Sequence, residues 1–344
     1  MDKKILVTGG TGYIGSHTVV ELQNSGYEVV VADNLSNSSE NVLDGIASIT
    51  GKKPVFEKID CCDKPALEAV FKRNAGISAV IHFAASKAVG ESVQMPLLYY
   101  RNNLVSLLNI LELMGEQNAP HLVFSSSCTV YGQPDVLPVT ESAPIKPATS
   151  PYGNTKQIAE EIIRDTVYAD SRLKCVALRY FNPAGAHPSA AIGELPNGVP
   201  NNLIPFVTQT AIGIRERLRV FGSDYNTPDG SAIRDYIYVV DLAKAHVIAV
   251  ERLLAGKNRK GVEFFNLGTG RGLSVLEILK EFEQATGVEV PREIVGRREG
   301  DVEQVWADPS FANSELGWKA ETSTGDMLKT AWNWEKSLCS RNIQ

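Results

Sequence analysis

The stretch Val7-Thr8-Gly9-Gly10-Thr11-Gly12-Tyr13-Ile14-Gly15 decides the fold of this chain. It follows a short apolar run, Ile5 to Thr8, and leads into a segment with helical periodicity, His17 to Asn24. Three glycines, Gly9, Gly12 and Gly15, let the backbone turn tightly and approach a pyrophosphate at the N-terminus of the helix. The stretch therefore predicts a strand, a phosphate-binding turn and a helix in that order.

A carboxylate follows the second apolar run, Glu28 to Ala32, where Asp33 and Asn34 come at the end of the strand. There Asp33 can accept hydrogen bonds from both hydroxyls of an adenine ribose, and its charge repels an additional 2′-phosphate. A plain glycine turn with a solvent-facing Asp33 is the alternative. The order of strand, turn, helix and second-strand acid favours a dinucleotide site that takes NAD rather than NADP.

Short apolar runs alternate with longer helical segments along the first half of the chain. Because neither face of these runs is polar, they are typical of parallel strands covered on both sides. The pattern predicts an α/β fold with a doubly wound parallel sheet (Rossmann). We expect strands at Ile5 to Thr8, Glu28 to Ala32, Val55 to Ile59, Ala79 to Phe83, Leu122 to Phe124, Cys175 to Tyr180 and Glu263 to Leu267, and helices at His17 to Asn24, Pro65 to Arg73, Leu97 to Gln117 and Tyr152 to Tyr168.

The amino-acid composition changes after Tyr180, where prolines, asparagines and glycines become frequent. We therefore expect residues 1–182 to form an NAD-binding Rossmann domain and residues 183–344 to form a smaller C-terminal α/β substrate domain. An amphipathic segment and a strand within residues 234–268 are expected to return in part to the first domain.

Composition narrows the class of protein. The 344 residues are 43% hydrophobic, and their net charge of −6 argues against a nucleic-acid or anionic-membrane surface. Five cysteines without a CxxC spacing favour reduced thiols in a soluble, cytoplasmic protein. The five histidines lack ligand spacing, so no metal site is expected.

Candidate ligand residues stand at the ends of the predicted strands, which meet at one edge of a parallel sheet. They are Asp60 and Cys61 after the third strand, Phe83, Ala84 and Lys87 after the fourth, Ser125 to Ser127 after the fifth, and Phe181 and Asn182 after the sixth.

Tyr152 and Lys156 lie one helical turn apart, behind the run that ends in Ser127. A phenol with an ordinary pKa of about 10 is a poor base at neutral pH unless a nearby ammonium and a cofactor cation favour the phenolate. The pair alone is a weak signal. Its position after the glycine turn and the serine strand predicts a nicotinamide enzyme whose acid and base is a tyrosine.

These motifs resemble the extended short-chain dehydrogenase/reductase family, and within it the nucleotide-sugar epimerases. The resemblance spans almost the whole chain. It rests on residues 7–18, Val80 to Ala85, Lys87-Ala88-Val89-Gly90-Glu91-Ser92-Val93, Phe124 to Gly132, Ser150 to Gly153, Leu178 to His187 and Arg297-Arg298-Glu299-Gly300-Asp301.

The resemblance implies interconversion of UDP-glucose and UDP-galactose by NAD-dependent oxidation and re-reduction at sugar carbon 4. By the same resemblance Tyr152 removes the proton of the 4-hydroxyl, Ser127 hydrogen-bonds the same oxygen, and Lys156 binds the nicotinamide ribose. Cofactor contacts carry over to Tyr13, Ile14, Asn37, Ser38, Lys87, Asn102 and Phe181, and substrate contacts to Lys87, Asn182, Asn202, Leu203, Phe221, Arg234, Arg298 and Asp301.

Val305 departs from the pattern of the family. Members strict for glucose and galactose commonly carry a tyrosine four residues after the aspartate of Arg-Arg-Glu-Gly-Asp, where this chain has Val305. The smaller side chain predicts activity on UDP-N-acetylglucosamine and UDP-N-acetylgalactosamine as well.

Two other functions compete. A nucleotide-sugar 4,6-dehydratase of the same family would need an Asp-Glu pair after the serine strand, where this chain has Cys128-Thr129. A non-catalytic, dinucleotide-bound sensor is disfavoured by the intact Ser127, Tyr152 and Lys156. The resemblance also implies a homodimer formed through Leu97 to Gln117 and Tyr152 to Tyr168. The roles of Cys128 and Arg219 stay open.

Overall fold

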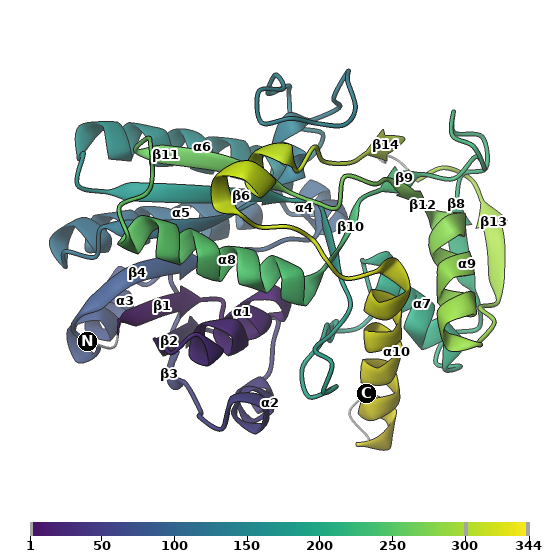
Figure 1. Cartoon of the computed structure of the whole chain (residues 1–344), viewed down its shortest axis with the longest axis horizontal. Helices are drawn as coiled ribbons and strands as arrows, with labels where there is room; N and C mark the ends of the chain where they lie inside the picture. Colours follow the sequence, from purple (N-terminus) through teal and green to yellow (C-terminus); the bar gives the residue numbers. More distant parts are fainter. Residues whose placement is uncertain (1–2, 299–301, 342–344) are drawn as a thin grey trace.

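A seven-stranded parallel sheet forms the larger part of the molecule, with the strand order β11-β6-β5-β4-β1-β2-β3 (Figure 1). The structure is a computed structural model that describes residues 3–298 and 302–341. The strands are β1 (Lys4–Thr8), β2 (Glu28–Asp33), β3 (Val55–Lys58), β4 (Ile77–His82), β5 (His121–Ser127), β6 (Lys174–Tyr180) and β11 (Val262–Leu267). This sheet confirms the predicted doubly wound α/β fold.

The strand order reverses beside β1, since β2 and β3 lie on one side of it and β4, β5 and β6 on the other. In open α/β sheets the ligand crevice forms at such a reversal, outside the carboxyl ends of the strands. The glycine turn follows β1, and Ser127 is the last residue of β5. Both groups therefore lie at the edge of the sheet where a ligand is expected.

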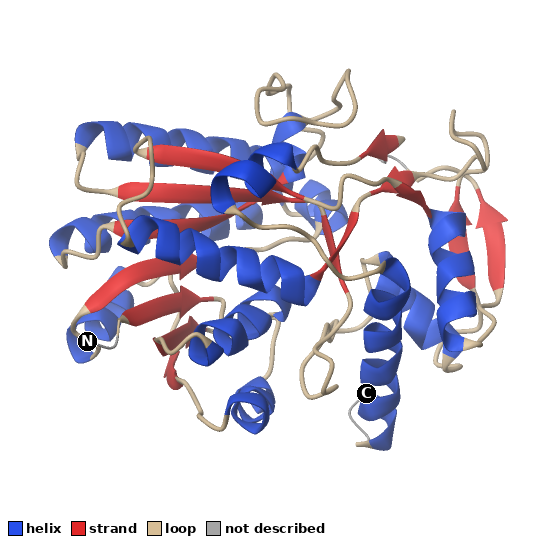
Figure 2. Ribbon diagram, viewed as in Figure 1, coloured by secondary structure: helices blue, strands red, loops and turns tan. Residues whose placement is uncertain are grey.

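Helices cover both faces of the sheet (Figure 2). Adjacent residues of β1 face opposite sides, so that Val7 contributes to the core under one helical layer and Leu6 to the core under the other. The first layer contains α1 (Tyr13–Asn24), α2 (Asn41–Thr50) and α8 (Val239–Leu254), and the second contains α3 (Lys64–Arg73), α5 (Pro96–Glu116) and α6 (Pro151–Ala169). Burial on both faces explains why the strands read as continuous apolar runs.

The remaining elements gather beyond the carboxyl ends of the sheet strands (Figure 1). β6 continues through Phe181 into β7 (Asn182–Ala184), which pairs with β10 (Tyr236–Tyr238). A separate core joins Val220, Phe282 and Leu328. The elements of this part are α7 (Leu203–Ala211), α9 (Val275–Thr286), α10 (Thr324–Ser340), β8 (Leu218–Phe221), β13 (Arg292–Val295), β9 (Ile233–Arg234), β12 (Leu273–Ser274) and β14 (Gln304–Val305).

Several element boundaries differ from the sequence-based expectation. α1 begins at Tyr13, four residues earlier than predicted, because Ser16 and Thr18 donate their hydroxyl hydrogens to the carbonyls of the preceding turn and so fit inside a helix. β5 extends through Ser127, since Ser125 to Ser127 pair with Leu178 to Tyr180 of β6. The helices α2 and α4 (Val89–Gln94) were not predicted.

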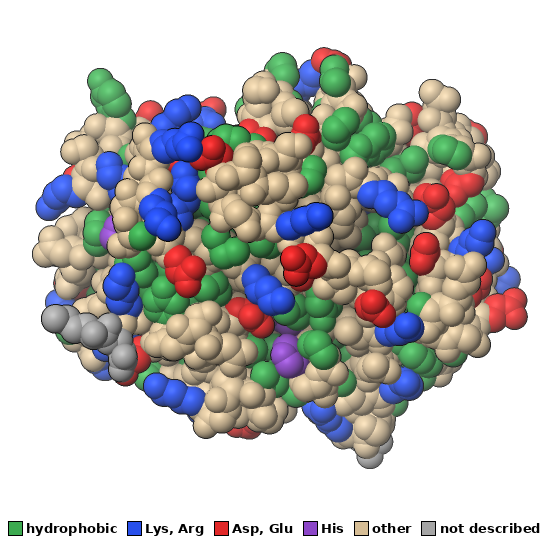
Figure 3. Space-filling view, viewed as in Figure 1, with side chains coloured by type: hydrophobic (Ala, Val, Ile, Leu, Met, Phe, Trp, Pro, Cys, Tyr) green, Lys and Arg blue, Asp and Glu red, His purple; other side chains and the backbone are tan. Residues whose placement is uncertain are grey.

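Charges of both signs are interspersed over the face of the molecule shown in Figure 3. In the part of the chain that the structure describes, no helix is both long enough and apolar enough to cross a membrane.

Candidate active site

The glycine turn between β1 and α1 is built so that nothing but hydrogen fits at two of its positions. Gly9 has φ +71°, and a Cβ there would lie 2.8 Å from the backbone nitrogen of Ala84. A Cβ on Gly15 would lie 2.2 Å from the carbonyl oxygen of Gly9. At Gly12 the only neighbour of such an atom is the Gly9 carbonyl, at 3.1 Å. The first and third glycines thus serve the packing of the turn, and the second leaves its outer side open, as a pyrophosphate requires.

Asp33 ties the glycine turn to the end of β2. Its Oδ2 accepts a hydrogen bond from the backbone of Thr11 at 3.2 Å, and its Oδ1 accepts from the backbone of Leu35 at 2.9 Å and from Ser38 Oγ at 3.3 Å. Ser38 Oγ also bonds Thr11 Oγ1 at 2.7 Å. The carboxylate is therefore fixed beside the turn, and the geometry fits the ribose-binding role expected for it.

The other predicted cofactor residues lie on the segments that follow the sheet strands and on α5. Asn34 donates to Asp60 Oδ2 at 3.3 Å, and Cys61 next to it is buried. Asn102, on α5, donates to Ser86 Oγ at 3.0 Å in the loop after β4. Lys87 Nζ lies 5.9 Å from the centre of the Tyr13 ring. Asn37 lies in the loop after β2, and Ile14 lies in the first turn of α1. Phe83 and Ala84 directly follow β4, and Phe181 directly follows β6.

The predicted catalytic residues lie together at the ends of β5 and α6. Ser150 caps α6 by accepting a hydrogen bond from the backbone of Gly153 at 3.1 Å, and Pro151 occupies the first turn. This start places Tyr152 and Lys156 on the sheet side of the helix. Lys156 Nζ donates to the carbonyl oxygen of Ser125 at 2.6 Å and lies 5.9 Å from the centre of the Tyr152 ring.

The environment shifts the pKa of both groups. Burial raises the pKa of Tyr152 to about 12, and a hydrogen bond with the Ser127 side chain acts in the opposite direction. Burial lowers the pKa of Lys156 to about 8, opposed by the charge of Glu160. The protein alone thus keeps the phenol protonated at neutral pH, so that a further positive charge is needed to form the phenolate.

Most of the predicted substrate residues lie in the second part of the molecule, beyond the large sheet. Asn202 caps α7 and donates to Glu194 Oε1 at 2.6 Å, and Leu203 opens that helix. The guanidinium carbon of Arg298 lies 5.7 Å from the centre of the Phe221 ring. Asn182 starts β7 and donates its backbone hydrogen to the Asp235 carbonyl at 2.9 Å. Asp301 lies outside the described residues.

Val305 and Arg234 lie between the predicted substrate residues and the end of β5 that carries Ser127. They face each other in the pairing of β14 with β9. Val305 is 7% exposed and packs in an apolar cluster with Phe181, beside Cys128. Because Cys128 follows Ser127 directly, the cluster brings Val305, the residue that departs from the family pattern, close to the end of β5.

The open questions about Cys128 and Arg219 have structural answers. Burial raises the pKa of Cys128 to about 12, against the effect of the Arg234 charge, so Cys128 is a thiol and not a nucleophilic thiolate at neutral pH. Arg219 forms a surface ion pair with Glu293 at 3.3 Å. Among the described residues there is no group of three His, Cys, Asp or Glu side chains that could hold a metal ion.

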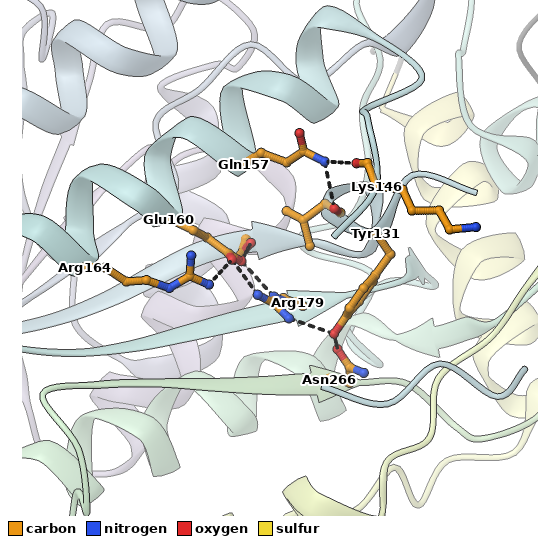
Figure 4. A network of polar contacts seen from close by, with 9 residues as sticks. Tyr131, Lys146, Gln157, Glu160, Arg164, Arg179 and Asn266 are labelled. Atoms are coloured by element: carbon orange, nitrogen blue, oxygen red, sulfur yellow. Dashed lines mark hydrogen bonds and ion pairs between the residues drawn. The ribbon is translucent and has the colours of Figure 1, made fainter. Parts of the chain in front are cut away.

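Sequence reasoning missed a buried polar network beneath the catalytic helix (Figure 4). Glu160 of α6 pairs with Arg179 of β6, and Arg179 Nη1 donates to Tyr131 Oη at 2.9 Å. Tyr131 in turn donates to Asn266 Oδ1 at 2.6 Å. Two signals could have revealed it: Glu160 follows Lys156 by four residues on one helical face, and Arg179 interrupts an otherwise apolar strand.

Glu194 was missed as well. It lies between Lys87 and Asn202, with its Oε1 at 3.4 Å from Lys87 Nζ and 2.6 Å from Asn202 Nδ2. The residue sits in a loop without periodicity, so no pattern pointed to it. It connects a predicted cofactor residue with a predicted substrate residue.

Comparison with known proteins places this geometry in a family. A family model described as GDP-mannose 4,6 dehydratase matches residues 6–331. UDP-glucose 4-epimerase of Bacillus subtilis is 54% identical over 333 residues, which cover 97% of each chain. UDP-glucose 4-epimerase of Dictyostelium discoideum is 52% identical over 335 residues, which cover 97% of this chain and 96% of the relative.

A solved structure shares the whole fold. UDP-glucose 4-epimerase from Bifidobacterium longum, crystallised with NAD+ and UDP, aligns with a TM-score of 0.94 at 47% identity and covers 99% of this chain and 100% of its own. The sequence relatives thus match this chain in sequence and in length, and the solved structure also matches it in fold. The chain belongs to the UDP-glucose 4-epimerase family, within the extended short-chain dehydrogenases/reductases.

Proposed function

We propose that this protein is an enzyme that interconverts UDP-glucose and UDP-galactose at sugar carbon 4, with NAD as its bound cofactor. The observation that carries the proposal is the joint placement of Ser127, Tyr152 and Lys156 at the edge of the sheet that the glycine turn also faces. The relatives that match the whole chain are named for this activity.

Each catalytic side chain has a distinct task in this reaction. Tyr152 Oη accepts the proton of the sugar 4-hydroxyl and later returns it. Ser127 hydrogen-bonds the same sugar oxygen and favours the phenolate, in keeping with its effect on the pKa of Tyr152. The Lys156 ammonium, held by the Ser125 carbonyl, provides a positive charge on the buried side of Tyr152. NAD, when bound, supplies the hydride acceptor and donor and, in its oxidised form, a second positive charge.

Cofactor and nucleotide are held by different parts of the chain in this proposal. Residues 1–182 bind NAD through the glycine turn and Asp33, and residues 183–344 bind the UDP-sugar, with part of 234–268 belonging to the first domain. The last assignment is supported by β11, which pairs with β6 in the large sheet, and by α8, which packs on that sheet. Arg234 and Arg298 are proposed to bind the diphosphate because their planar guanidinium groups donate paired hydrogen bonds.

Dehydration is the weaker candidate. The matching family model has a dehydratase name, but elimination of water from carbons 5 and 6 needs an additional acid and base at the reaction centre. The residues after Ser127 are Cys128 and Thr129, and the Cys128 thiol, with a pKa raised by burial to about 12, does not serve as a base at neutral pH.

One assay separates the candidate functions. Purified protein incubated with UDP-galactose is expected to form UDP-glucose without added NAD, because the cofactor is regenerated in each cycle. A dehydratase would instead yield a 4-keto-6-deoxy sugar, and a sensor would yield no product. Either of these two results would refute the proposed function.

Val305 is proposed to admit substrates with a 2-acetamido group. Replacing Val305 by tyrosine is expected to lower kcat/KM for UDP-N-acetylglucosamine at least tenfold and to change that for UDP-galactose less than about threefold, since overfilling a packed site costs about 1–3 kcal/mol. Ile294→Tyr, on the exposed face of β13, serves as a control. Absence of turnover of the N-acetyl sugar by the unmodified enzyme would contradict the role of Val305.

We further propose a homodimer in a cytoplasmic setting. The proposed contact is through α5 and α6, because apolar side chains on α5 are exposed, among them Leu97, Leu98 and Leu108. Cys61, Cys62, Cys128 and Cys175 are free thiols, which fits a reducing compartment. A monomeric mass in light scattering would argue against the dimer.

A further inference from the structure

Two opposite charges of the catalytic helix are tied to neighbouring residues of β5. Lys156 is 4% exposed and donates from Nζ to the Ser125 carbonyl at 2.6 Å. Glu160 lies one turn further along α6, is 2% exposed, and its Oε1 accepts a hydrogen bond from Ser126 Oγ at 2.7 Å. The next residue of β5, Ser127, carries the hydroxyl that bonds Tyr152. Glu160 is thus part of the immediate frame of the catalytic residues, although it does not contact the reacting atoms.

Arg179 neutralises Glu160 in a paired geometry (Figure 4). Its Nε donates to Oε1 at 2.8 Å and its Nη2 to Oε2 at 2.5 Å. Arg179 is also 2% exposed, and the face of its guanidinium lies 4.5 Å from the centre of the Phe264 ring. Water therefore screens neither charge well. Removal of Glu160 leaves the Arg179 charge without its carboxylate, and removal of Arg179 leaves Glu160 with the partly exposed Arg164 at 3.5 Å.

Four buried side chains around this frame are neutral at physiological pH. Facing Lys156, burial lowers the pKa of His82 on β4 to about 3 and raises that of Tyr180 on β6 far above its ordinary value. Facing the ion pair, burial raises the pKa of Cys175 on β6 and raises that of Tyr131 to about 12. Two further charged groups lie at its margin: Arg164 of α6, 44% exposed and 3.5 Å from Glu160, and Glu141, which interacts electrostatically with Arg179.

We propose that the buried Glu160–Arg179 ion pair is a positioning element that fixes the charge balance around Lys156 and Tyr152, and thereby the pH range in which the enzyme turns over. The proposal rests on the epimerase function proposed above. In the intact pair the two charges largely cancel at the catalytic residues. In the enzyme with its retained dinucleotide, the cationic lysine and the anionic phenolate then coexist in one interval of pH, and the ion pair fixes where that interval lies.

The sign of the expected effect follows from elementary electrostatics. If Glu160 is replaced by glutamine, the positive charge of Arg179 remains uncompensated. This charge disfavours the Lys156 ammonium and favours the Tyr152 phenolate, so that the pKa of each group falls. The acid limb of the rate profile depends on phenolate formation, and the alkaline limb depends on loss of the ammonium proton. Both limbs therefore move toward lower pH.

The experiment measures kcat and kcat/KM for UDP-galactose as a function of pH in the purified enzyme with its retained dinucleotide. For Glu160→Gln both limbs are expected to shift by about one unit toward acid, a magnitude typical of one buried charge near a titrating group. Arg179→Gln is expected to shift them toward alkali. The double variant, Glu160→Gln with Arg179→Gln, restores neutrality and is expected to return the profile to its original position.

A second measurement, a titration of Tyr152 itself, does not depend on turnover. The ultraviolet absorbance of the Tyr152 phenolate, obtained by subtracting the same variant with Tyr152→Phe, is titrated without substrate. It is expected to shift in the same direction as the acid limb. Because this titration needs no sugar, it tests the charge balance even if the proposed reaction is absent.

A matched control separates charge balance from loss of stability. Arg252 and Glu263 form a second buried ion pair, 9% and 8% exposed, at 2.7 Å between α8 and β11, away from the catalytic helix. Glu263→Gln is expected to lower the thermal unfolding temperature without displacing the pH profile. The proposal is overturned if Glu160→Gln titrates at the original position, or if Glu263→Gln shifts the profile as far. Should Glu160→Gln fail to fold, the opposite shift in Arg179→Gln decides.

Discussion

Replacement of Tyr152 by phenylalanine is expected to lower kcat about a thousandfold while the dinucleotide stays bound. In the proposed reaction the phenol exchanges a proton with the sugar 4-oxygen, and general acid–base catalysis typically contributes 10² to 10⁴ in rate. The ring itself is kept, so the packing around Lys156, whose Nζ lies 5.9 Å from its centre, is preserved. The measurements are kcat with UDP-galactose and the content of dinucleotide released on denaturation.

Tyr168 provides the matched control for this variant. It lies on the same helix, near its other end, and is 93% exposed. Tyr168→Phe is expected to leave kcat unchanged. Near-normal turnover in Tyr152→Phe would remove the phenol from the mechanism, and a loss of bound dinucleotide would show that the ring serves binding rather than proton transfer.

A methyl group at Gly15 is expected to abolish retention of the dinucleotide and to lower the free energy of unfolding by about 3 kcal/mol, the upper part of the range for overpacking. The new Cβ would lie 2.2 Å from the carbonyl oxygen of Gly9 and 2.9 Å from the Cα of Gly10. Both are backbone atoms of the turn, which cannot rotate away as a side chain could. The turn must open, and the backbone groups that face the pyrophosphate move with it.

Two further glycine variants make this test specific. A Cβ on Gly115, in the last turn of α5, meets no atom within 4 Å from other parts of the described chain, so Gly115→Ala is expected to be neutral or to stabilise by up to about 1 kcal/mol. A Cβ on Gly12 meets only the Gly9 carbonyl, at 3.1 Å. Gly12→Ala is therefore expected to fold with little loss of stability yet to bind the dinucleotide weakly. Chemical denaturation and the dinucleotide content of the purified variants measure both effects. Full retention in Gly15→Ala would contradict the role assigned to the turn.

The sheet was well predicted from the sequence because most of its strands are buried on both faces and because the candidate ligand residues follow the strand ends. The runs around Val7, Val80 and Val176 have no polar alternation, and each is followed by glycine or polar side chains at the ligand edge. The N-cap Ser150 and the first-turn Pro151 likewise have a local physical meaning that does not depend on the rest of the fold.

The second part of the molecule was harder to predict because its strands are only two to four residues long. Such strands carry too few residues to show periodicity, and their partners are far away in sequence, as in the pairing of Gln304 with Ile233. The contact of Glu160 with Arg179 was difficult to predict for a similar reason, because it depends on how α6 packs against β6. Charged residues are ordinarily read as exposed, and only the tertiary fold shows that these two compensate each other.

The path of the chain limits how this enzyme can be recombined with its relatives. After β7 the chain enters the part proposed to bind the UDP-sugar, but α8 and β11 return to the large sheet before α9 and α10 leave it again. A chimera with a single junction after Asn182 would exchange an edge strand and a covering helix of the sheet together with the elements proposed to bind the sugar. An exchange of substrate preference that spares the sheet needs two inserts, one on each side of α8 and β11.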